Sequence, residues 1–274
     1  MNTAALLWGS VRAENRRFWR TPIAAFFTLG LPLVMLVLFV ALFGNDPQAT
    51  SDYGPLTTAQ FYAAGLGVFA AGSATYTNLT MNLTTRREAG ILKRVRSTPL
   101  PPWVFLSGAV LSAVWLAALS LTVMVAVGVA AYGVEVRLTQ LPVMAAAFVA
   151  GAVCFATLGV ALASVSSSVS SGQAVANATI LPLAFVSNVF IALDEPPEWM
   201  TRVGDAFPLK AFAVAFTDAM NSRDGWSGFA SDRFVVLGAW TLVGVLIALR
   251  AFRWEPQSPQ SQPRRQRSSR RSGV

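Results

Sequence analysis

The segment TTRREAGILKRVRSTPLPPW, residues 84–103, lies between two long uncharged apolar runs and decides how the chain can be folded. Its charged side chains are those of Arg86, Arg87, Glu88, Lys93, Arg94 and Arg96. An arginine or lysine at the centre of a membrane helix costs about 3 kcal/mol or more, unless it reaches the surface. The segment is therefore expected outside the bilayer, and its excess of Arg and Lys indicates the cytoplasmic side.

The composition is that of a polytopic membrane protein. Hydrophobic residues make up 54% of the chain and charged residues only 12%, and the mean hydropathy is +0.53. A soluble domain carries about 25% charged residues. The single cysteine, Cys154, excludes an internal disulfide, and the absence of histidine excludes the usual zinc sites and Ser-His triads. We expect no catalytic residue and no metal site.

Six segments are apolar and long enough to cross a bilayer, since about 20 residues at about 1.5 Å each span a hydrocarbon core of about 30 Å. The charge-free run 138–193 is about twice the length of one span, and the polar tract SVSSSVSSGQ divides it. The predicted fold is an all-α membrane protein with six transmembrane helices. The predicted spans are 22–43, 60–83, 103–132, 138–163, 173–193 and 234–252.

The distribution of Arg and Lys sets the expected orientation. The N-terminal segment, the 84–102 loop, the serine tract and the C-terminal tail hold about 16 of the 21 basic residues, so these parts are placed inside. Both termini are then cytoplasmic. Residues 1–254 form the predicted membrane domain, and residues 255–274 form a disordered basic tail. Anionic lipid is an expected contact of the tail, whereas nucleic acid is not an expected partner.

Two segments outside the spans show amphipathic spacing. In residues 4–19 a helix would gather apolar residues on one face, which suits an interfacial helix on the inner leaflet; the alternative is a positively charged flank that only sets topology. In residues 194–233 large apolar residues recur at three- and four-residue spacing, which predicts short outer helices that re-enter the membrane. The alternative there is a plain solvated loop. The residues that carry the two patterns are Leu6, Leu7, Val11 and Phe18, and Trp199, Met200, Val203 and Phe207.

The motifs RREAGILKRVRSTPLPP, LPLAFVSNVFIALDEPPEWM and FPLKAF, in this order and topology, resemble those of type-2 ATP-binding-cassette (ABC) exporter permeases of the daunorubicin-resistance type. The resemblance implies that the loop after the second span forms a coupling helix that docks on a separate ATPase subunit. It also implies re-entrant helices after the fifth span. Asn188 stands where many relatives have glycine. The residues assigned to coupling are Arg86, Arg87, Glu88, Gly90, Leu92, Arg96 and Pro99.

The resemblance further implies a non-catalytic subunit. No G-x-x-x-x-G-K-[ST] loop is present, so ATP and Mg²⁺ are expected on the partner ATPase. A second permease, identical or related, completes the expected exporter in a bacterial plasma membrane. The expected cargo is an amphipathic drug, antibiotic or lipid-like compound. A polysaccharide or glycolipid exporter, or a membrane anchor that transports nothing, is the alternative.

A short helix over residues 85–95 would present Arg86, Arg87, Lys93 and Arg94 to an acidic groove, and the following prolines would end it. Topology setting alone is the simpler explanation of these charges. Glu88 is expected to form a salt bridge, either to the partner or to the interfacial helix. Its alternative is an intrahelical pair at four-residue spacing.

Polar residues within the spans are the candidates for a translocation path, although hydrogen bonding between helices also explains them. These candidates are Asn78, Asn82, Asn177, Ser187 and Asn188. A secondary transporter would place charged residues within its spans, and none is found well inside the six. An intramembrane protease would need a base beside its nucleophile, and we expect neither histidine nor a buried lysine to serve.

Overall fold

The computed structural model describes residues 3–50, 54–91, 102–190, 196–221 and 229–251, which are almost entirely helical. The helices of the first half are α1 (Thr3–Trp19), α2 (Pro22–Ala25), the π-helix η1 (Phe26–Gly30), α3 (Leu31–Phe43), α4 (Thr58–Ser73), the π-helix η2 (Ala74–Asn78) and α5 (Leu79–Glu88). Those of the second half are α7 (Pro102–Tyr132), α8 (Leu141–Val165), α9 (Val169–Val186), α10 (Glu198–Ala206), α11 (Pro208–Asn221) and α12 (Ser231–Ala251). The described residues depart from the all-α prediction in one antiparallel hairpin, β1 (Pro47–Thr50) with β2 (Gly54–Thr57).

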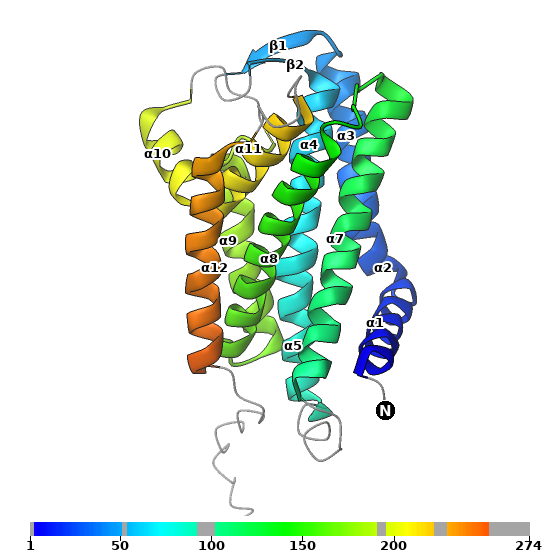
Figure 1. The fold of residues 1–274 in the computed structure, drawn as a ribbon, viewed down its shortest axis with the longest axis vertical. Coiled ribbons are helices and arrows are strands. Elements are labelled where there is room, and N and C mark those ends of the chain that lie inside the picture. The colour runs from blue at the N-terminus through cyan, green and yellow to red at the C-terminus, as the bar shows by residue number, and fades with distance from the viewer. Residues whose placement is uncertain (1–2, 51–53, 92–101, 191–195, 222–228, 252–274) are drawn as a thin grey trace, which may run out of the picture.

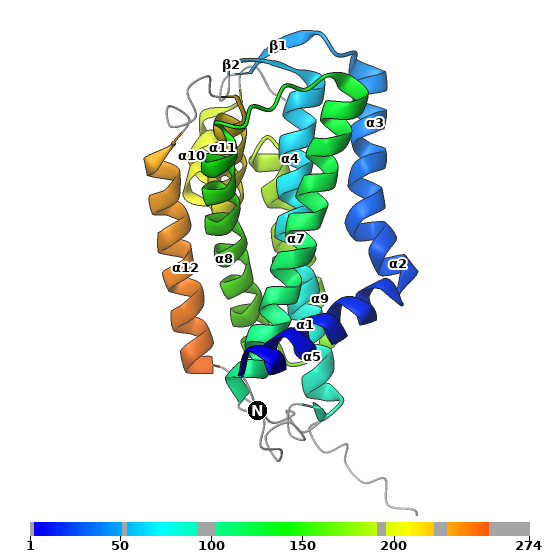
Figure 2. The same ribbon diagram turned by 45° about the vertical axis from the view of Figure 1, so that its right-hand side comes forward.

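The long helices run side by side along the long axis of the molecule (Figure 1). Helix α1 instead lies across one end of the bundle, against α7 (Figure 2). The C-terminal ends of α5 and α12 lie at the same end, so both ends of the described chain are on one side. We call this the Arg-rich end, because it carries Arg12, Arg16, Arg17, Arg20, Arg86, Arg87 and Arg250. The opposite end, with β1 and β2, is the hairpin end.

The predicted amphipathic helix at the N-terminus is confirmed as α1. Its close approach to α7 is visible at Gly108, where a Cβ atom would lie 2.6 Å from the Cβ of Ser10. Arg12 and Arg16 are exposed on the other side of the helix, and Arg17 is exposed at the edge of the face that packs on the bundle. The apolar residues predicted to share a face are all half-buried: Leu6, Leu7, Val11 and Phe18.

Five helical segments are long and apolar enough to cross a membrane: Phe26–Phe43, Trp103–Tyr132, Leu141–Val165, Val169–Val186 and Ser231–Ala251. They overlap the first, third, fourth, fifth and sixth predicted spans. The predicted span 60–83 is helical throughout, but η2 divides it into α4 and α5. The bundle therefore contains helix at all six predicted positions, and five of these helical segments have the length and hydropathy of a candidate span.

The wide turn of η2 fits directly against α8. A Cβ atom at Gly159 of α8 would lie 2.7 Å from the carbonyl oxygen of Thr75 and 3.0 Å from that of Tyr76. The hydroxyl of Thr80 contacts the carbonyl oxygens of Tyr76 (2.7 Å) and Gly159 (3.0 Å). Single-turn π-helices of this kind are frequent at functional sites, and here only glycine permits the approach.

The segment after α9 forms two short helices at the hairpin end, so the solvated-loop alternative is wrong for residues 198–221. Helices α10 and α11 are separated by Phe207, whose backbone is extended. Helix α11 is buried on nearly all sides and packs against α8, α4 and α12. Large apolar side chains such as Phe212 and Phe216, both nearly inaccessible, thereby fill the centre of the bundle at this end.

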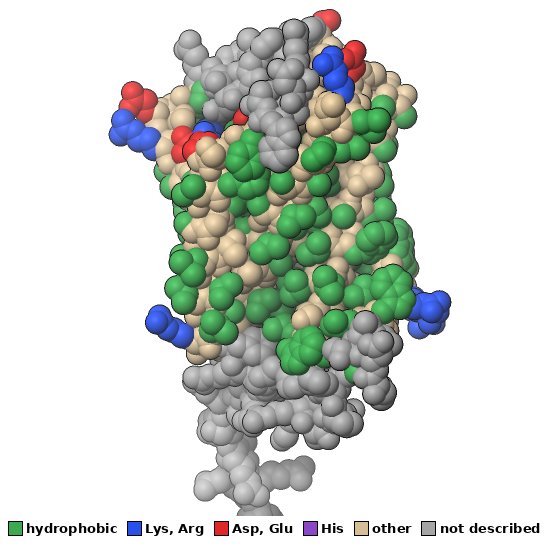
Figure 3. All heavy atoms as spheres, viewed as in Figure 1, with side chains coloured by type: hydrophobic (Ala, Val, Ile, Leu, Met, Phe, Trp, Pro, Cys, Tyr) green, Lys and Arg blue, Asp and Glu red, His purple; other side chains and the backbone are tan. Residues whose placement is uncertain are grey.

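The surface has the character expected of a multi-pass membrane protein. In the view of Figure 3, a band without charged side chains separates the Arg-rich end from the hairpin end, where the Asp and Glu side chains gather. Exposed apolar residues such as Ile23, Leu42, Val235 and Leu242 cover the helices. An apolar surface of this extent needs lipid around it.

Candidate functional site

The predicted coupling segment follows α5 at the Arg-rich end. Arg86, Arg87, Glu88 and Gly90 are described, whereas the other coupling residues, Leu92, Arg96 and Pro99, lie outside the described residues. Helix α5 ends at Glu88, and Gly90 has a φ angle of 68°. A left-handed residue ends an α-helix, so the predicted continuous helix over residues 85–95 is wrong at Gly90.

Arg87 joins the end of α5 to the end of α8. Its Nη1 donates to the carbonyl oxygen of Ala163 at 2.8 Å, and its Nη2 donates to that of Ser166. The last carbonyl groups of a helix have no partner within the helix and carry partial negative charge. The side chain is only 4% exposed. Burial lowers the pKa of Arg87, and the charge of Glu88 opposes that shift; a guanidinium remains charged nonetheless.

Glu88 binds the beginning of the next helix. Its Oε1 accepts a hydrogen bond from the backbone N–H of Val169 at 2.7 Å, at the first residue of α9, where a negative charge is favourable. Ser168 and Ser171 complete this helix start as a reciprocal capping box. The pair Arg87–Glu88 thus places a positive charge at the end of α8 and a negative charge at the start of α9. We call these contacts the α5 clamp.

Arg86 points the other way, toward α1. It forms an ion pair with Glu14, whose second carboxylate oxygen accepts from Nδ2 of Asn82 at 3.1 Å. The guanidinium also lies over the ring of Phe105, 4.9 Å from its centroid, which is a cation–π contact. Three neighbouring residues at the end of α5 therefore connect it to α1, α8 and α9.

These contacts correct the prediction that Arg86 and Arg87 face an acidic groove, because both side chains are buried within this chain. A salt bridge to the N-terminal helix does exist, but Arg86 makes it in place of Glu88. Glu14 was missed by sequence reasoning. It is the first acidic residue of the chain and lies among Arg12, Arg16 and Arg17, which is the signal that could have identified it.

The five candidates for a translocation path have four different environments. Asn78 donates to the hydroxyl of Thr28 in η1 at 3.1 Å, and Asn82 binds Glu14. Asn177 lies on the exposed face of α9. Ser187 and Asn188 are buried where α9 ends. The structure therefore does not unite them in one site.

Asn188 occupies a left-handed position, with φ of 53°. Its N–H donates to the carbonyl oxygen of Phe185, and the N–H of Val189 donates to that of Ala184, which is a Schellman helix end. Glycine and asparagine are the residues that adopt this conformation most easily, so an asparagine here can take the place of the glycine that the resemblance leads one to expect.

We expect Asn188→Gly to leave thermal stability in detergent nearly unchanged, and Asn188→Ala to lower the free energy of unfolding by about 1–2 kcal/mol. The difference arises because a Cβ atom is unfavourable at positive φ. Thermal unfolding monitored by size-exclusion chromatography measures it. Equal losses in the two variants would show that the asparagine side chain matters more than the backbone conformation.

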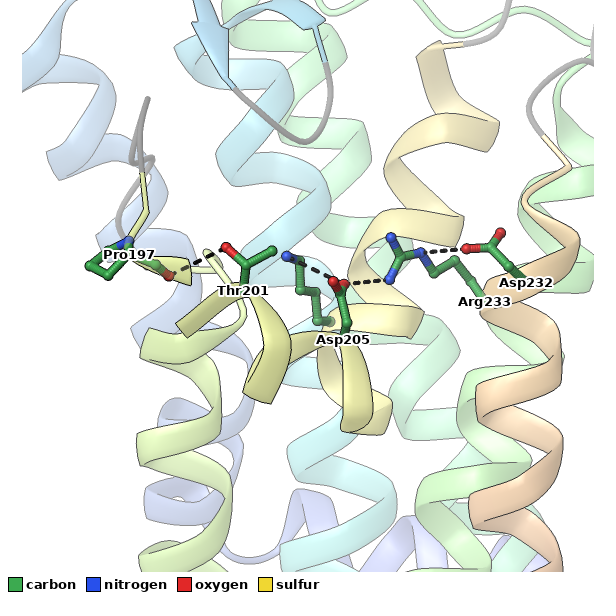
Figure 4. A network of polar contacts seen from close by, with 6 residues as sticks. Pro197, Thr201, Asp205, Asp232 and Arg233 are labelled. Carbon is green, nitrogen blue, oxygen red and sulfur yellow. Dashed lines mark hydrogen bonds and ion pairs between the residues drawn. The ribbon is translucent and has the colours of Figure 1, made fainter. Parts of the chain in front are cut away.

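A charged network fixes the outer helices at the hairpin end (Figure 4). Oδ1 of Asp205, in α10, lies 2.6 Å from Nη1 of Arg233 and 3.4 Å from Nζ of Lys210. Lys210, in α11, is only 1% exposed, so the expectation of no buried lysine is wrong. Burial would raise the pKa of Asp205, but the hydrogen bond from Arg233 and the charges of Lys210 and Arg233 outweigh it and hold the pKa below its ordinary value.

The sequence resembles known transporters along most of its length. The family model described as ABC-2 type transporter matches residues 5–221. A relative from Streptomyces coeruleorubidus, the daunorubicin resistance ABC transporter permease protein DrrB1, is 30% identical over 255 residues, which cover 90% of this chain and 83% of that protein. These matches confirm the resemblance carried by the motifs. The chain therefore belongs to the ABC-2 type transporter family, as a non-catalytic membrane permease subunit.

Proposed function

We propose that this chain is the membrane permease of an ABC exporter that moves an amphipathic small molecule outward across a bacterial plasma membrane. A separate ATPase subunit supplies the energy, with ATP and Mg²⁺ bound there. Six spans, with α10 and α11 re-entrant from the outer side, form the permease. The Arg-rich end and both termini face the cytoplasm, in agreement with the positive-inside rule, and the basic tail of residues 255–274 extends there.

The α5 clamp is the observation that carries this proposal. The coupling segment follows α5 directly, and a docked ATPase would move it when ATP is hydrolysed. Arg87 and Glu88 transmit such a movement to the ends of α8 and α9, because their contacts are short and Arg87 is buried. Lys93, Arg94 and Arg96 lie outside the described residues and remain the proposed contacts with the ATPase.

The open face of α9 supports pairing with a second permease. Gln173 and Asn177 are exposed on this helix, as are Val175 and Leu181. An uncompensated side-chain amide in hydrocarbon costs several kcal/mol, so this face is better suited to a second subunit or a water-filled path than to lipid. A homodimer, or a heterodimer with a related permease, would provide that cover.

The cargo follows from the relative's name, which concerns daunorubicin resistance. An amphipathic drug, antibiotic or lipid-like compound fits that relationship. A polysaccharide or glycolipid exporter and a non-transporting membrane anchor share the same topology. Transport by the complete complex separates these alternatives.

We expect a tagged chain, solubilised gently from its native membrane, to co-purify with an ABC ATPase in stoichiometric amount. Arg94→Glu with Arg96→Glu should abolish this co-purification by reversing the charge of the docking loop.

Glu88→Gln should retain the ATPase but reduce ATP-dependent uptake of daunorubicin, used as an amphipathic probe, about fivefold in inverted vesicles, since a charged helix-end contact contributes about 1 kcal/mol.

Arg16→Glu, on the exposed side of α1, is the control for the loop variant and should retain the ATPase. Recovery of wild-type protein without an ATPase would contradict the permease proposal. Full transport by Glu88→Gln would contradict the role of the clamp, while leaving the exporter assignment intact.

A further inference from the structure

A cavity of about 270 Å³ lies between α1, the η2–α5 segment and α7, near the Arg-rich end. Its wall changes in polarity along the axis of the bundle. The charged residues of the wall, Glu14 and Arg17, lie at the Arg-rich end. The wall about two to three helical turns deeper carries no charge and is formed mainly by apolar side chains such as Ala74 and Leu116, with Asn78 and Ser112 among them. A molecule with a polar head and an apolar tail matches this order.

The charges at the cavity favour an anionic head group. Both carboxylate oxygens of Glu14 are engaged, one with Arg86 and the other with Asn82. Arg17 follows Glu14 by three residues on α1 and is exposed. No carboxylate among the described residues pairs with Arg17. A negatively charged ligand would give Arg17 the partner that this part of the chain does not supply.

We propose that the cavity binds one phospholipid of the leaflet at the Arg-rich end, with its phosphate at Arg17 and part of one acyl chain along Leu79, Ala113 and Leu116. Helix α1 lies crosswise with Trp8 and Trp19 exposed, as is typical of a helix at the membrane interface. The position of the head group therefore coincides with that of the lipid head groups. Assignment to the cytoplasmic leaflet rests on the orientation proposed above.

The size of the cavity allows only part of a lipid to enter it. A volume of 270 Å³ is many times the roughly 30 Å³ of one water molecule. It is below the range of about 300–1,000 Å³ of pockets that enclose a drug-sized ligand. The occupant is thus inserted in part, and the rest of it stays in the bilayer. A lipid held between α1 and α5 would stabilise the Glu14–Arg86 contact, because a ligand that binds only the folded state stabilises it.

Native mass spectrometry of the purified chain, reconstituted with phosphatidylglycerol, tests the proposal. We expect the wild type to retain one phosphatidylglycerol molecule, and Arg17→Gln to bind it about fivefold more weakly, as the loss of one basic contact to an anionic lipid implies. Arg16→Gln is the matched control on the adjacent exposed arginine. Ala113→Phe should abolish retention by filling the cavity, and Leu111→Phe, on an exposed position of α7, should not.

Equal retention by Arg17→Gln and Arg16→Gln would overturn the proposal, because the bound lipid would then be bulk boundary lipid. Retention of a daunorubicin-like amphiphile in place of phospholipid would also overturn it and would assign the cavity to cargo. Arg17→Gln changes only an exposed side chain, so the test remains decisive if Ala113→Phe fails to fold. The assay uses no ATPase, and its outcome is independent of the proposed exporter function.

Discussion

Replacing Arg87 with alanine is expected to reduce the recovery of folded protein severalfold and to lower its thermal midpoint by on the order of 10 °C. The guanidinium is 4% exposed and donates to the carbonyl oxygens of Ala163 and Ser166. A hydrogen bond that involves a charged group contributes about 1.5–3 kcal/mol, and both acceptors would lose their partner. A loss of about 3–6 kcal/mol is large against a total stability of about 5–15 kcal/mol.

Size-exclusion chromatography of the detergent-solubilised protein after heating measures this effect. Arg16→Ala, on the exposed side of α1, is the matched control and should change the midpoint little. Arg87→Lys should be intermediate, since an ammonium group keeps the charge but cannot reproduce the two-pronged contact. A midpoint for Arg87→Ala equal to that of Arg16→Ala would show that α8 and α9 are held together without this arginine.

The helices could largely be predicted from hydropathy, because a membrane span must be long, apolar and internally hydrogen-bonded. The third and sixth predicted spans differ from α7 and α12 by at most three residues at either end. The division of the second span by η2 could not be predicted in this way. The carbonyl groups of η2 lie against Gly159 of the neighbouring helix, and hydropathy carries no information about such a contact.

The sequence identified the charged residues at the end of α5, but it did not show what their side chains contact. Positive charges in a loop mark the cytoplasmic side whether they face a partner or their own chain. Whether Arg86 and Arg87 turn inward depends on Glu14, Ala163 and Ser166, which are distant in sequence. Local signals do account for the helix ends, since Gly90 and Asn188 are residue types that tolerate positive φ.

At the hairpin end, the burial of the lysine in the FPLKAF motif likewise could not be predicted from the sequence. Lys210 is only 1% exposed, and the three-dimensional fold alone places its Nζ 3.4 Å from Oδ1 of Asp205. A buried cation with an ion-pair partner is costly to separate from that partner. Asp205 therefore joins α10 to charged side chains of α11 and α12.

Asp205→Asn is expected to destabilise the protein by about 3 kcal/mol, the lower end of the range for breaking a buried ion pair, because Asp205 itself is 40% exposed. Asp232 is the matched control. It contacts Arg233 from a position that is 71% exposed, so Asp232→Asn should cost less than about 1 kcal/mol. Adding Lys210→Met to Asp205→Asn should restore part of the lost stability, since the buried charge is removed with its partner.

The pKa of Asp205 also predicts how the stability of the protein depends on pH. The folded-state pKa of Asp205 is lowered, so its contribution is fully present above the unfolded-state pKa of about 4 and is lost as pH falls through the folded value. The thermal midpoint of the wild type should therefore fall more steeply below about pH 4 than that of Asp205→Asn. Parallel pH profiles for the two proteins would show that Asp205 does not hold α10 to α11 and α12. We instead expect the thermal midpoints of the two proteins to converge at low pH, because the contacts of Asp205 with α11 and α12 require its carboxylate to be ionised.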